Sequence, residues 1–320
     1  MNDYDLRLDR NSSFINDLIN QKKLYDILSS ALEIGLFDKI STTSSKIQLS
    51  KKYGFEPETL ELLLKVLVHA GYIEEKDDIV LNSEVTQTFL LKKSFRNMIS
   101  EFSNNSAAKI IVNCIRAKVS PRKEPEWSEK RLLRLGNSAL NGAILNLINS
   151  VDLTDRRNLL DLGGGHGFYS IAFAKKYPNL NITLQDLPQV MPFVQKIINK
   201  FKLQKQIKLM PIDFVKEDIV GNYDTILCSN ILHYDKIDIV LPKVYKALCP
   251  NGLFVLKNRV SDHEDNLENS IRRLFWHIKG GRVIYSTGDW TDILKKYDFL
   301  EISTRFFYEI NAVITAKKTG

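Results

Sequence analysis

The stretch LLDLGGGHGFYS, residues 159–170, decides the fold of this chain. An apolar run that contains Asp161 ends at Leu162, and three glycines follow at every second position, at 163, 165 and 167. A glycine loop between a buried strand and a helix is typical of open α/β sheets, because glycine permits a tight turn and the close approach of a ligand to the backbone. We therefore expect a strand, a ligand-binding loop and a helix in this stretch.

The sequence around the loop predicts a parallel sheet. From residue 158 onward, short apolar segments alternate with helical segments such as 190–201 and 237–252, a pattern typical of a sheet with helices on both faces. The last two apolar segments follow each other directly, so we expect an antiparallel pair at the edge of the sheet. The seven predicted strands lie within 158–162, 181–187, 206–214, 223–232, 252–260, 299–309 and 310–318.

The N-terminal part of the chain has a helical pattern. Apolar residues at helical spacing predict one helix over 24–40, a short helix that stops at Gly54, and a third that begins with Pro57 and ends at Gly71. Two short apolar segments around a charged tip predict a hairpin over 72–82. Three helices followed by a hairpin indicate a winged-helix module.

A winged-helix module often binds DNA, but the charges of the third helix argue against that function here. This helix carries Glu56, Glu58 and Glu61 against a single Lys65. Carboxylates at these positions would repel DNA phosphates. We therefore expect a module for packing or dimerisation.

The composition is that of a globular chain. It has 320 residues, 44% of them apolar, and a net charge of +7 whose basic residues are scattered, which argues against a nucleic-acid partner. No apolar run reaches the roughly 18 residues of a membrane span, and the N-terminus lacks the apolar segment of a signal peptide. Three distant cysteines show no metal-ligand spacing and indicate a reducing compartment. We expect a cytoplasmic protein with no metal.

The residues of the loop indicate which ligand it holds. A phosphate loop needs a Lys followed by Ser or Thr, and neither follows these glycines. A dinucleotide loop needs the spacing G-x-G-x-x-G, whereas the third glycine position here is Phe168. Asp161, next to the loop, would repel a pyrophosphate but suits a ligand with an ammonium or a sulfonium. The loop therefore predicts S-adenosylmethionine as the cofactor.

The ends of the next two strands agree with this prediction. Asp186 ends the second strand, 25 residues after Asp161, where nucleoside-binding sheets have an acid for ribose hydroxyls. Asp213 and Phe214 follow the third strand, where an acid accepts from an adenine amino group and an aromatic face covers the ring. With Asp161, these make three acids at successive strand ends, which is more than chance placement of turn residues would give.

Together these motifs resemble the caffeic-acid and hydroxyindole O-methyltransferase family, which includes bacterial enzymes for small molecules. The resemblance covers nearly the whole chain. It implies a Rossmann-like α/β sheet of class I methyltransferases, with a winged-helix dimerisation domain over 1–100, a helical linker over 101–150 and a methyltransferase domain over 151–320. The matching segments are ALEIGLFDKI, TLELLLKVLVHAGYIEEKDDIVLN, LLDLGGGHG, LQDLPQV, PIDF, NILHYD, KALCPNGLFVL and GGRVIYSTGDWTDILKKYDF.

The resemblance also implies a set of site residues. His233, in ILHYDK, corresponds to the general base of the family, and a His with a pKa near 6.5 can take the proton of an attacking hydroxyl. Ser229 stands where plant members often have a Lys that contacts the cofactor. The residues expected to bind S-adenosylmethionine are Asp161, Gly163, Gly165, Asp186, Leu187, Asp213, Phe214 and Ser229.

The acceptor is expected to be a small aromatic molecule or another natural product of secondary metabolism, in an apolar, aromatic pocket. The candidate pocket residues are Phe102, Trp127, Phe275, Trp276 and Tyr285. Each of these side chains is also a candidate for the core.

Two departures from the family keep other functions open. The carboxylates that flank the base in catalytic members are replaced by Asn258 and Ile284, with Asp235 and Asp262 as the available substitutes. Methylation at carbon or nitrogen, or a protein that only binds the cofactor, therefore remains an alternative to methylation at oxygen. A nucleic-acid methyltransferase is disfavoured, because SNILHYD stands where such enzymes need an N/D-P-P-Y/F motif.

Overall fold

The computed structural model divides the chain into two compact units. It describes residues 13–42, 45–92, 106–117, 127–140, 142–232, 236–262, 265–278, 284–307 and 311–320. The N-terminal unit comprises the described residues up to 117 together with residues 265–278, which contain one helix, and the sheet unit comprises the remaining described residues. None of the helices in these ranges combines the length and apolarity needed to cross a membrane.

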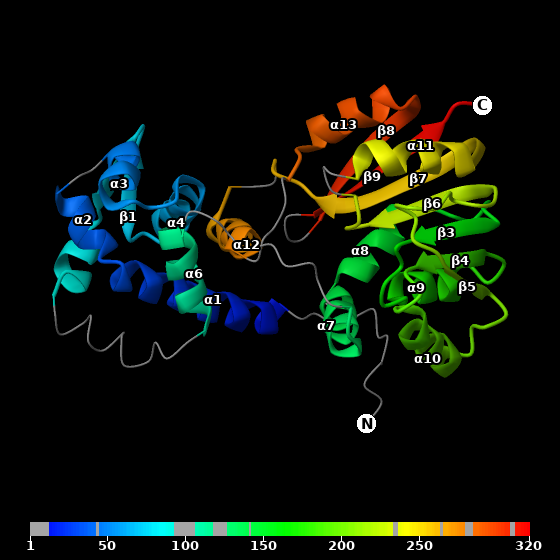
Figure 1. Ribbon diagram of the computed structural model, residues 1–320, viewed down its shortest axis with the longest axis horizontal. Helices are drawn as coiled ribbons and strands as arrows, with labels where there is room; N and C mark the ends of the chain where they lie inside the picture. The colour runs from blue at the N-terminus through cyan, green and yellow to red at the C-terminus, as the bar shows by residue number, and fades with distance from the viewer. Residues whose placement is uncertain are drawn as a thin grey trace. The chain divides into compact units, whose positions relative to one another are not determined.

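The sheet unit contains a seven-stranded sheet in the order β5-β4-β3-β6-β7-β9-β8 (Figure 1). The first five strands of this order are parallel, and β9 is antiparallel to both neighbours. The predicted α/β sheet with an antiparallel last pair is confirmed. The strands are β3 (Asn158–Leu162), β4 (Asn181–Asp186), β5 (Ile207–Pro211), β6 (Tyr223–Ser229), β7 (Leu248–Arg259), β8 (Phe299–Phe307) and β9 (Asn311–Lys318).

Helices cover both faces of this sheet, because each face carries its own row of apolar side chains. Leu159, Leu227 and Val255 belong to a core shared with α8, α9 and α10, whereas Leu160 and Ile226 belong to a core shared with α11 and α13. The helices are α7 (Glu129–Leu140), α8 (Ala143–Ser150), α9 (Phe168–Lys176), α10 (Met191–Phe201), α11 (Ile237–Ala247) and α13 (Thr287–Lys296).

The N-terminal unit is helical with one hairpin, as predicted. The hairpin pairs Ile73 with Asn82 in antiparallel register. The helix predicted over 24–40 is interrupted at residues 34–35, where Gly35 takes a φ of 65°. The elements are α1 (Ser13–Glu33), α2 (Leu36–Thr42), α3 (Lys46–Tyr53), α4 (Pro57–His69), β1 (Ile73–Lys76), β2 (Ile79–Asn82), η1 (Thr86–Leu90), α6 (Ser106–Ala117) and α12 (Leu267–Ile278).

The helix α12 lies between β7 and α13 in the chain but packs in the core of the N-terminal unit. Ile271, Leu274 and Phe275 of α12 are buried in one cluster with Leu60 and Leu63 of α4. Two side-chain contacts accompany this packing, from His69 to Ser270 and from Thr59 to His277. The domain bounds 1–100, 101–150 and 151–320 remain predictions.

Candidate cofactor-binding site

The glycine loop joins β3 to α9 with a backbone that non-glycine residues rarely adopt. Gly163, Gly165 and Gly167 have φ values of 67°, 54° and 76°, all in the left-handed region. The Gly167 N–H closes the turn by donating to the carbonyl of Gly164 at 2.9 Å. The spacing of glycine at every second position is therefore a requirement of this turn.

The loop is fixed to the carboxyl end of β4. The amides of Gly163 and Gly164 donate to the carbonyl of Gln185 at 2.7 and 3.2 Å. The carboxylate of Asp186 accepts from the Gly165 N–H and from the Leu187 N–H, each at 2.7 Å. Burial raises the pKa of Asp186, and these two hydrogen bonds oppose the shift. Four of the predicted cofactor residues, Gly163, Gly165, Asp186 and Leu187, therefore lie together.

Asp161 is a second buried carboxyl group beneath the same loop. It is 1% exposed and accepts a hydrogen bond from the Ser170 hydroxyl at 2.6 Å. Burial raises its pKa to about 7, and the nearby charge of Asp186 acts in the same direction. Neither carboxyl group has a cationic ion-pair partner among the described residues. Because the two carboxyl groups raise the cost of charging this site, a cationic ligand fits it well.

Phe214 lies against the first glycine of the loop. A Cβ atom built on Gly163 would lie 3.4 Å from the Phe214 ring and 2.7 Å from Ile231, so this face of the loop is closed to any larger residue. Asp213, beside it, accepts from the Val215 N–H and forms an ion pair with the exposed Lys216. Phe214 is thus packed at the loop, whereas the carboxylate of Asp213 is half-buried and partly engaged.

The carboxyl end of β6 contains polar atoms without partners. The hydroxyl oxygen of Ser229 and the Oδ1 atom of Asn230 are buried and have no hydrogen-bond partner among the described residues. Asn230 has a φ of 57°, and its N–H donates to the carbonyl of Lys257 at 2.8 Å. Buried polar atoms of this kind are usually satisfied by a ligand or by water.

The predicted base, His233, lies outside the described residues with Tyr234 and Asp235, so its side chain has no structural description. The residue before it is fixed by Asn258, whose amide donates to the carbonyl of Leu232 at 2.9 Å. Asp262 is exposed, and its carboxylate accepts from the Thr287 N–H at the start of α13. Asp262 is thus a helix-capping residue, which weakens its case as the missing carboxylate.

The predicted acceptor residues fall in both units. In the sheet unit, Trp127 packs under the Arg131 guanidinium, and Tyr285 meets Trp290 edge to face at 5.5 Å between ring centroids. In the N-terminal unit, Phe275 is a core residue of α12, and Trp276 beside it is half-buried. Phe102 lies outside the described residues. Their role in binding an acceptor stays a prediction.

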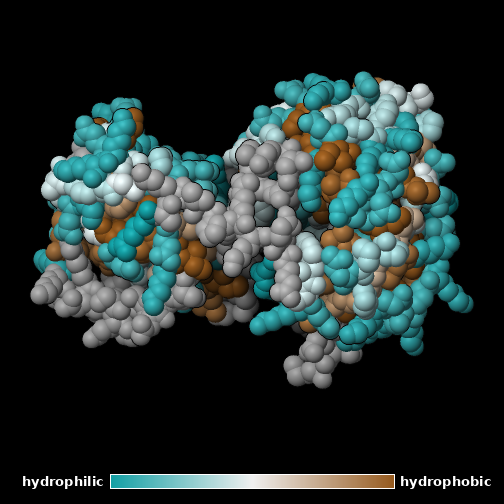
Figure 2. Space-filling model, viewed as in Figure 1, coloured by the Kyte–Doolittle hydropathy of each residue, from teal (hydrophilic) through white to brown (hydrophobic). Residues whose placement is uncertain are grey.

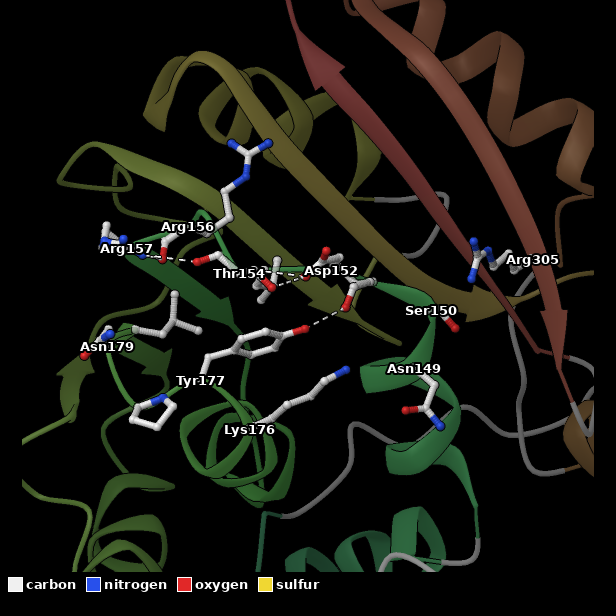
Figure 3. Close-up of a pocket in the computed structure, with 14 residues that line it drawn as sticks. Asn149, Ser150, Asp152, Thr154, Arg156, Arg157, Lys176, Tyr177, Asn179 and Arg305 are labelled. Atoms are coloured by element: carbon white, nitrogen blue, oxygen red, sulfur yellow. Dashed lines mark hydrogen bonds between the residues drawn. The ribbon is translucent and has the colours of Figure 1, made fainter.

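A cleft of about 580 Å³ lies at the amino ends of β3 and β4, at the opposite end of these strands from the glycine loop (Figure 3). It is lined by residues that precede β3 and β4 and by Arg305. Among these residues, Arg156, Arg157 and Lys176 carry positive charges, and each of them already donates to backbone carbonyls. Ligands of open α/β sheets bind at the carboxyl ends of the strands. The glycine loop, and not this cleft, is therefore the candidate site.

Three residues of the site were not predicted from the sequence. Ser170 lies in the first turn of α9, and its only signal in the sequence is a hydroxyl three residues after the last glycine. His166 is buried within the loop, and burial together with the charge of Lys257 lowers its pKa to about 4. Lys257 itself lies in VLKNRV, and a lysine within an apolar strand segment is the sequence signal that could have identified it.

Comparisons with known proteins agree with this geometry. The pattern of the O-methyltransferase domain family matches residues 123–299. An uncharacterized protein of Methanocaldococcus jannaschii is 27% identical over 85% of this chain and 78% of its own length. The 3-hydroxy-5-methyl-1-naphthoate 3-O-methyltransferase of Streptomyces sahachiroi is 24% identical over 87% of this chain and 86% of its own.

Among solved structures, an O-methyltransferase family 2 protein from Planctomyces limnophilus shares the fold. Its TM-score is 0.71 at 18% identity, with 97% of each chain covered, and it was solved in complex with apigenin. The family match covers more than half of the chain, and the matched residues include every motif from the glycine loop to the last helix. The chain therefore belongs to the O-methyltransferase domain family, and this membership makes it an S-adenosylmethionine-dependent methyltransferase.

Proposed function

We propose that this enzyme transfers a methyl group from S-adenosylmethionine to a hydroxyl oxygen of a small aromatic acceptor. The observation that carries the proposal is the pair of buried carboxyl groups beneath the glycine loop. Asp161 and Asp186 have raised pKa values and no ion-pair partner among the described residues, so a cationic ligand over the loop would stabilise their charged forms.

Different residues of the site are assigned to different parts of the cofactor. Asp186, held by two backbone N–H groups, keeps lone pairs free for ribose hydroxyls. Phe214 offers a ring face for the adenine, and Gly163 and Gly165 let the backbone approach the ligand. Asp161 complements the positive charge of the amino-acid end. When bound, the cofactor supplies a methyl group on a sulfonium, which is transferred by in-line displacement.

His233 is the proposed general base. A phenol with a pKa near 10 is a poor nucleophile at neutral pH, and a His at hydrogen-bond distance accelerates attack about 10²–10⁴-fold by taking the proton. The hydrogen bond from Asn258 to Leu232 holds the backbone one residue before His233. Asn258 therefore acts as a positioning residue for the segment, in the place where catalytic members of the family have a carboxylate.

The comparisons support an aromatic acceptor. A relative that aligns with most of this chain is an O-methyltransferase of a naphthoate, and a solved structure of the same fold holds apigenin. Methylation at carbon or nitrogen is the second candidate, because Asn258 and Ile284 replace the two expected carboxylates. A protein that binds the cofactor without transferring methyl is the third.

The test is transfer of isotope from methyl-labelled S-adenosylmethionine to a panel of phenols, aromatic amines and C-nucleophiles. We expect labelled ethers from phenols. His233→Ala should lower turnover at least about 10²-fold while cofactor affinity, measured by titration calorimetry, stays unchanged. Wild-type turnover in this variant would exclude His233 as the base, and label on carbon or nitrogen alone would select the second candidate.

We also propose that the protein is a homodimer formed through the N-terminal unit. This unit exposes several large apolar side chains, and Figure 2 shows apolar surface on its visible face. Sedimentation should give twice the chain mass of 36.8 kDa. Leu81→Lys should produce monomers, and Val220→Lys, at an exposed position of the sheet unit, should leave the dimer intact. A wild-type monomer would contradict the proposal.

A further inference from the structure

A lysine is buried at the carboxyl end of β7. The side chain of Lys257 is 5% exposed, and it is the only lysine or arginine below 9% exposure in the part of the chain that the structure describes. A buried ammonium loses its hydration, so it persists in the charged form only where polar or anionic groups compensate it. The proposed mechanism gives Lys257 no role.

The strand register places this side chain on the cofactor side of the sheet. Lys257 pairs with Ser229 of β6, so the two side chains share one face. Asp161 lies on the same face, because it pairs with Leu227, two residues before Ser229. The Lys257 ammonium lies 3.4 Å from Asn311 Oδ1 and 5.9 Å from the centroid of the Tyr169 ring in the first turn of α9.

The positive charge of Lys257 reaches the glycine loop. It contributes to the lowered pKa of His166, a loop residue, after the larger effect of burial. Beside Lys257 in the sheet, the buried Ser229 hydroxyl has no partner among the described residues. The cation of Lys257 and the unsatisfied Ser229 hydroxyl thus lie side by side on the face of the sheet that also carries Asp161.

The cofactor contains an anionic group that matches this pair. Its amino-acid end carries a carboxylate as well as an ammonium, and the two acids of the site cannot bind this carboxylate, because ionised carboxyl groups only accept hydrogen bonds and repel another anion. The segments that form the site, 159–170, 184–190, 211–214 and 228–232, contain no Lys or Arg. A cation for the carboxylate therefore has to come from another strand, and Lys257 comes from the neighbouring one.

We propose that the Lys257 ammonium binds the carboxylate of S-adenosylmethionine and that the Ser229 hydroxyl donates a hydrogen bond to the same group. This inference rests on the proposed placement of the cofactor over the glycine loop. It makes Lys257 a cofactor-binding residue, and it explains the burial of both groups at adjacent positions of β6 and β7.

The test compares two ligands by titration calorimetry without any acceptor. One is S-adenosylmethionine, and the other is decarboxylated S-adenosylmethionine, which lacks only the carboxylate. The wild type should bind the first ligand about 10- to 100-fold more tightly, as expected for a charge-assisted hydrogen bond. Lys257→Met should remove this preference by weakening the first ligand alone, and Lys257→Arg should restore part of it. Lys317→Met, at the other end of the neighbouring strand β9, is the control and should keep the preference.

Equal affinity of the wild type for the two ligands would overturn the inference without any variant, so it can fail even if Lys257→Met does not fold. It is also overturned if Lys257→Met weakens both ligands equally or neither. Unchanged cofactor binding with a raised KM for a carboxylated acceptor would instead assign Lys257 to the anion of the acceptor. A wild type that prefers the carboxylated ligand but transfers no methyl would refute the proposed function and leave the role of Lys257 intact.

Discussion

Gly165 differs from its neighbours in the loop in what a side chain would meet. A Cβ atom at Gly163 would lie 2.7 Å from Ile231, and one at Gly164 would lie 2.5 Å from Leu184, whereas at Gly165 the nearest atom is the Gly163 carbonyl oxygen at 3.8 Å. The space beside Gly165 is therefore open to a ligand. Its N–H holds Asp186, so the residue joins the loop to the predicted ribose-binding acid.

Gly165→Asp should reduce cofactor affinity at least about 100-fold, because a third carboxylate would enter the open space beside Asp161 and Asp186 and the backbone φ of 54° is unfavourable for it. Titration calorimetry with S-adenosylhomocysteine measures the effect. Gly71→Asp is the control, since Gly71 has a φ of 77°, lies in the N-terminal unit and meets no atom within 4 Å. Unchanged affinity in Gly165→Asp would refute the site.

Asp161 should make the ligand-free protein less stable as the pH rises. Its pKa of about 7 in the folded state lies above the ordinary 3.8, so the folded protein keeps a proton that the unfolded chain releases above about pH 4. The free energy of unfolding therefore decreases from about pH 4 to about pH 7. Asp161→Asn removes this dependence.

We expect Asp161→Asn to melt about 2–4 °C or more above the wild type at pH 8, with a smaller difference at pH 4.5. Its cofactor affinity at pH 8 should fall, since the amide cannot complement a cation. Differential scanning fluorimetry at the two pH values checks the first effect, and calorimetry checks the second. An equal difference in melting temperature at both pH values would show that Asp161 is not the titrating group.

At the scale of elements, the carboxyl end of β7 holds the segment that follows β6 in place through hydrogen bonds. The carbonyl of Lys257 accepts from the Asn230 N–H, and the amide of Asn258 donates to the carbonyl of Leu232. These two hydrogen bonds fix both ends of the segment that leads to His233. A carboxylate at position 258 would accept hydrogen bonds only, so it would lose the contact with Leu232.

Asn258→Asp should therefore destabilise the protein by about 1–3 kcal/mol and lower turnover more than cofactor affinity. The side chain is buried, so the new charge also loses hydration. Denaturant unfolding and steady-state kinetics are the measurements. Asn251→Asp, an exposed position of the same strand, is the control and should change neither. An Asn258→Asp enzyme with wild-type turnover would show that this contact does not position the segment.

Most elements were predictable because their signals are local. The seven strands of the sheet overlap the apolar segments of the sequence, and Gly54 ends α3 with a φ of 66° as expected. The uninterrupted helix over 24–40 was wrong for a physical reason. Residues on both sides of Gly35, such as Ile27 and Phe37, are buried in the same core, so the apolar spacing continues across the turn and hides it.

At the scale of the whole molecule, α12 links sequence-distant parts of the N-terminal unit. Its buried face, which includes Ile271 and Leu274, completes the core formed by α4 and α6. The helix is separated from α4 by the whole first part of the sheet unit. The N-terminal unit therefore cannot complete its core from the first 117 residues alone.

A fragment of residues 1–124 should consequently fail to fold cooperatively, because the surface that α12 covers would be exposed to water. Linking residues 264–281 to this fragment should restore a cooperative thermal transition. Circular dichroism and calorimetry measure both. In the linked fragment, Leu274→Ala should cost about 2–5 kcal/mol. Cooperative unfolding of the fragment without α12 would contradict the role assigned to this helix.

The sequence by itself determined the sheet, the glycine loop and the family, because these follow from local spacing. Apolar periodicity specifies strands and helices, and a turn with three left-handed residues at every second position strongly favours glycine at each of them. Only the tertiary structure decided which groups act on one another. The contacts of Asp161 with Ser170, of Asn258 with Leu232 and of α12 with α4 join residues whose distances are set by packing, and the burial that raises the pKa of Asp161 exists only once the sheet and its helices enclose it.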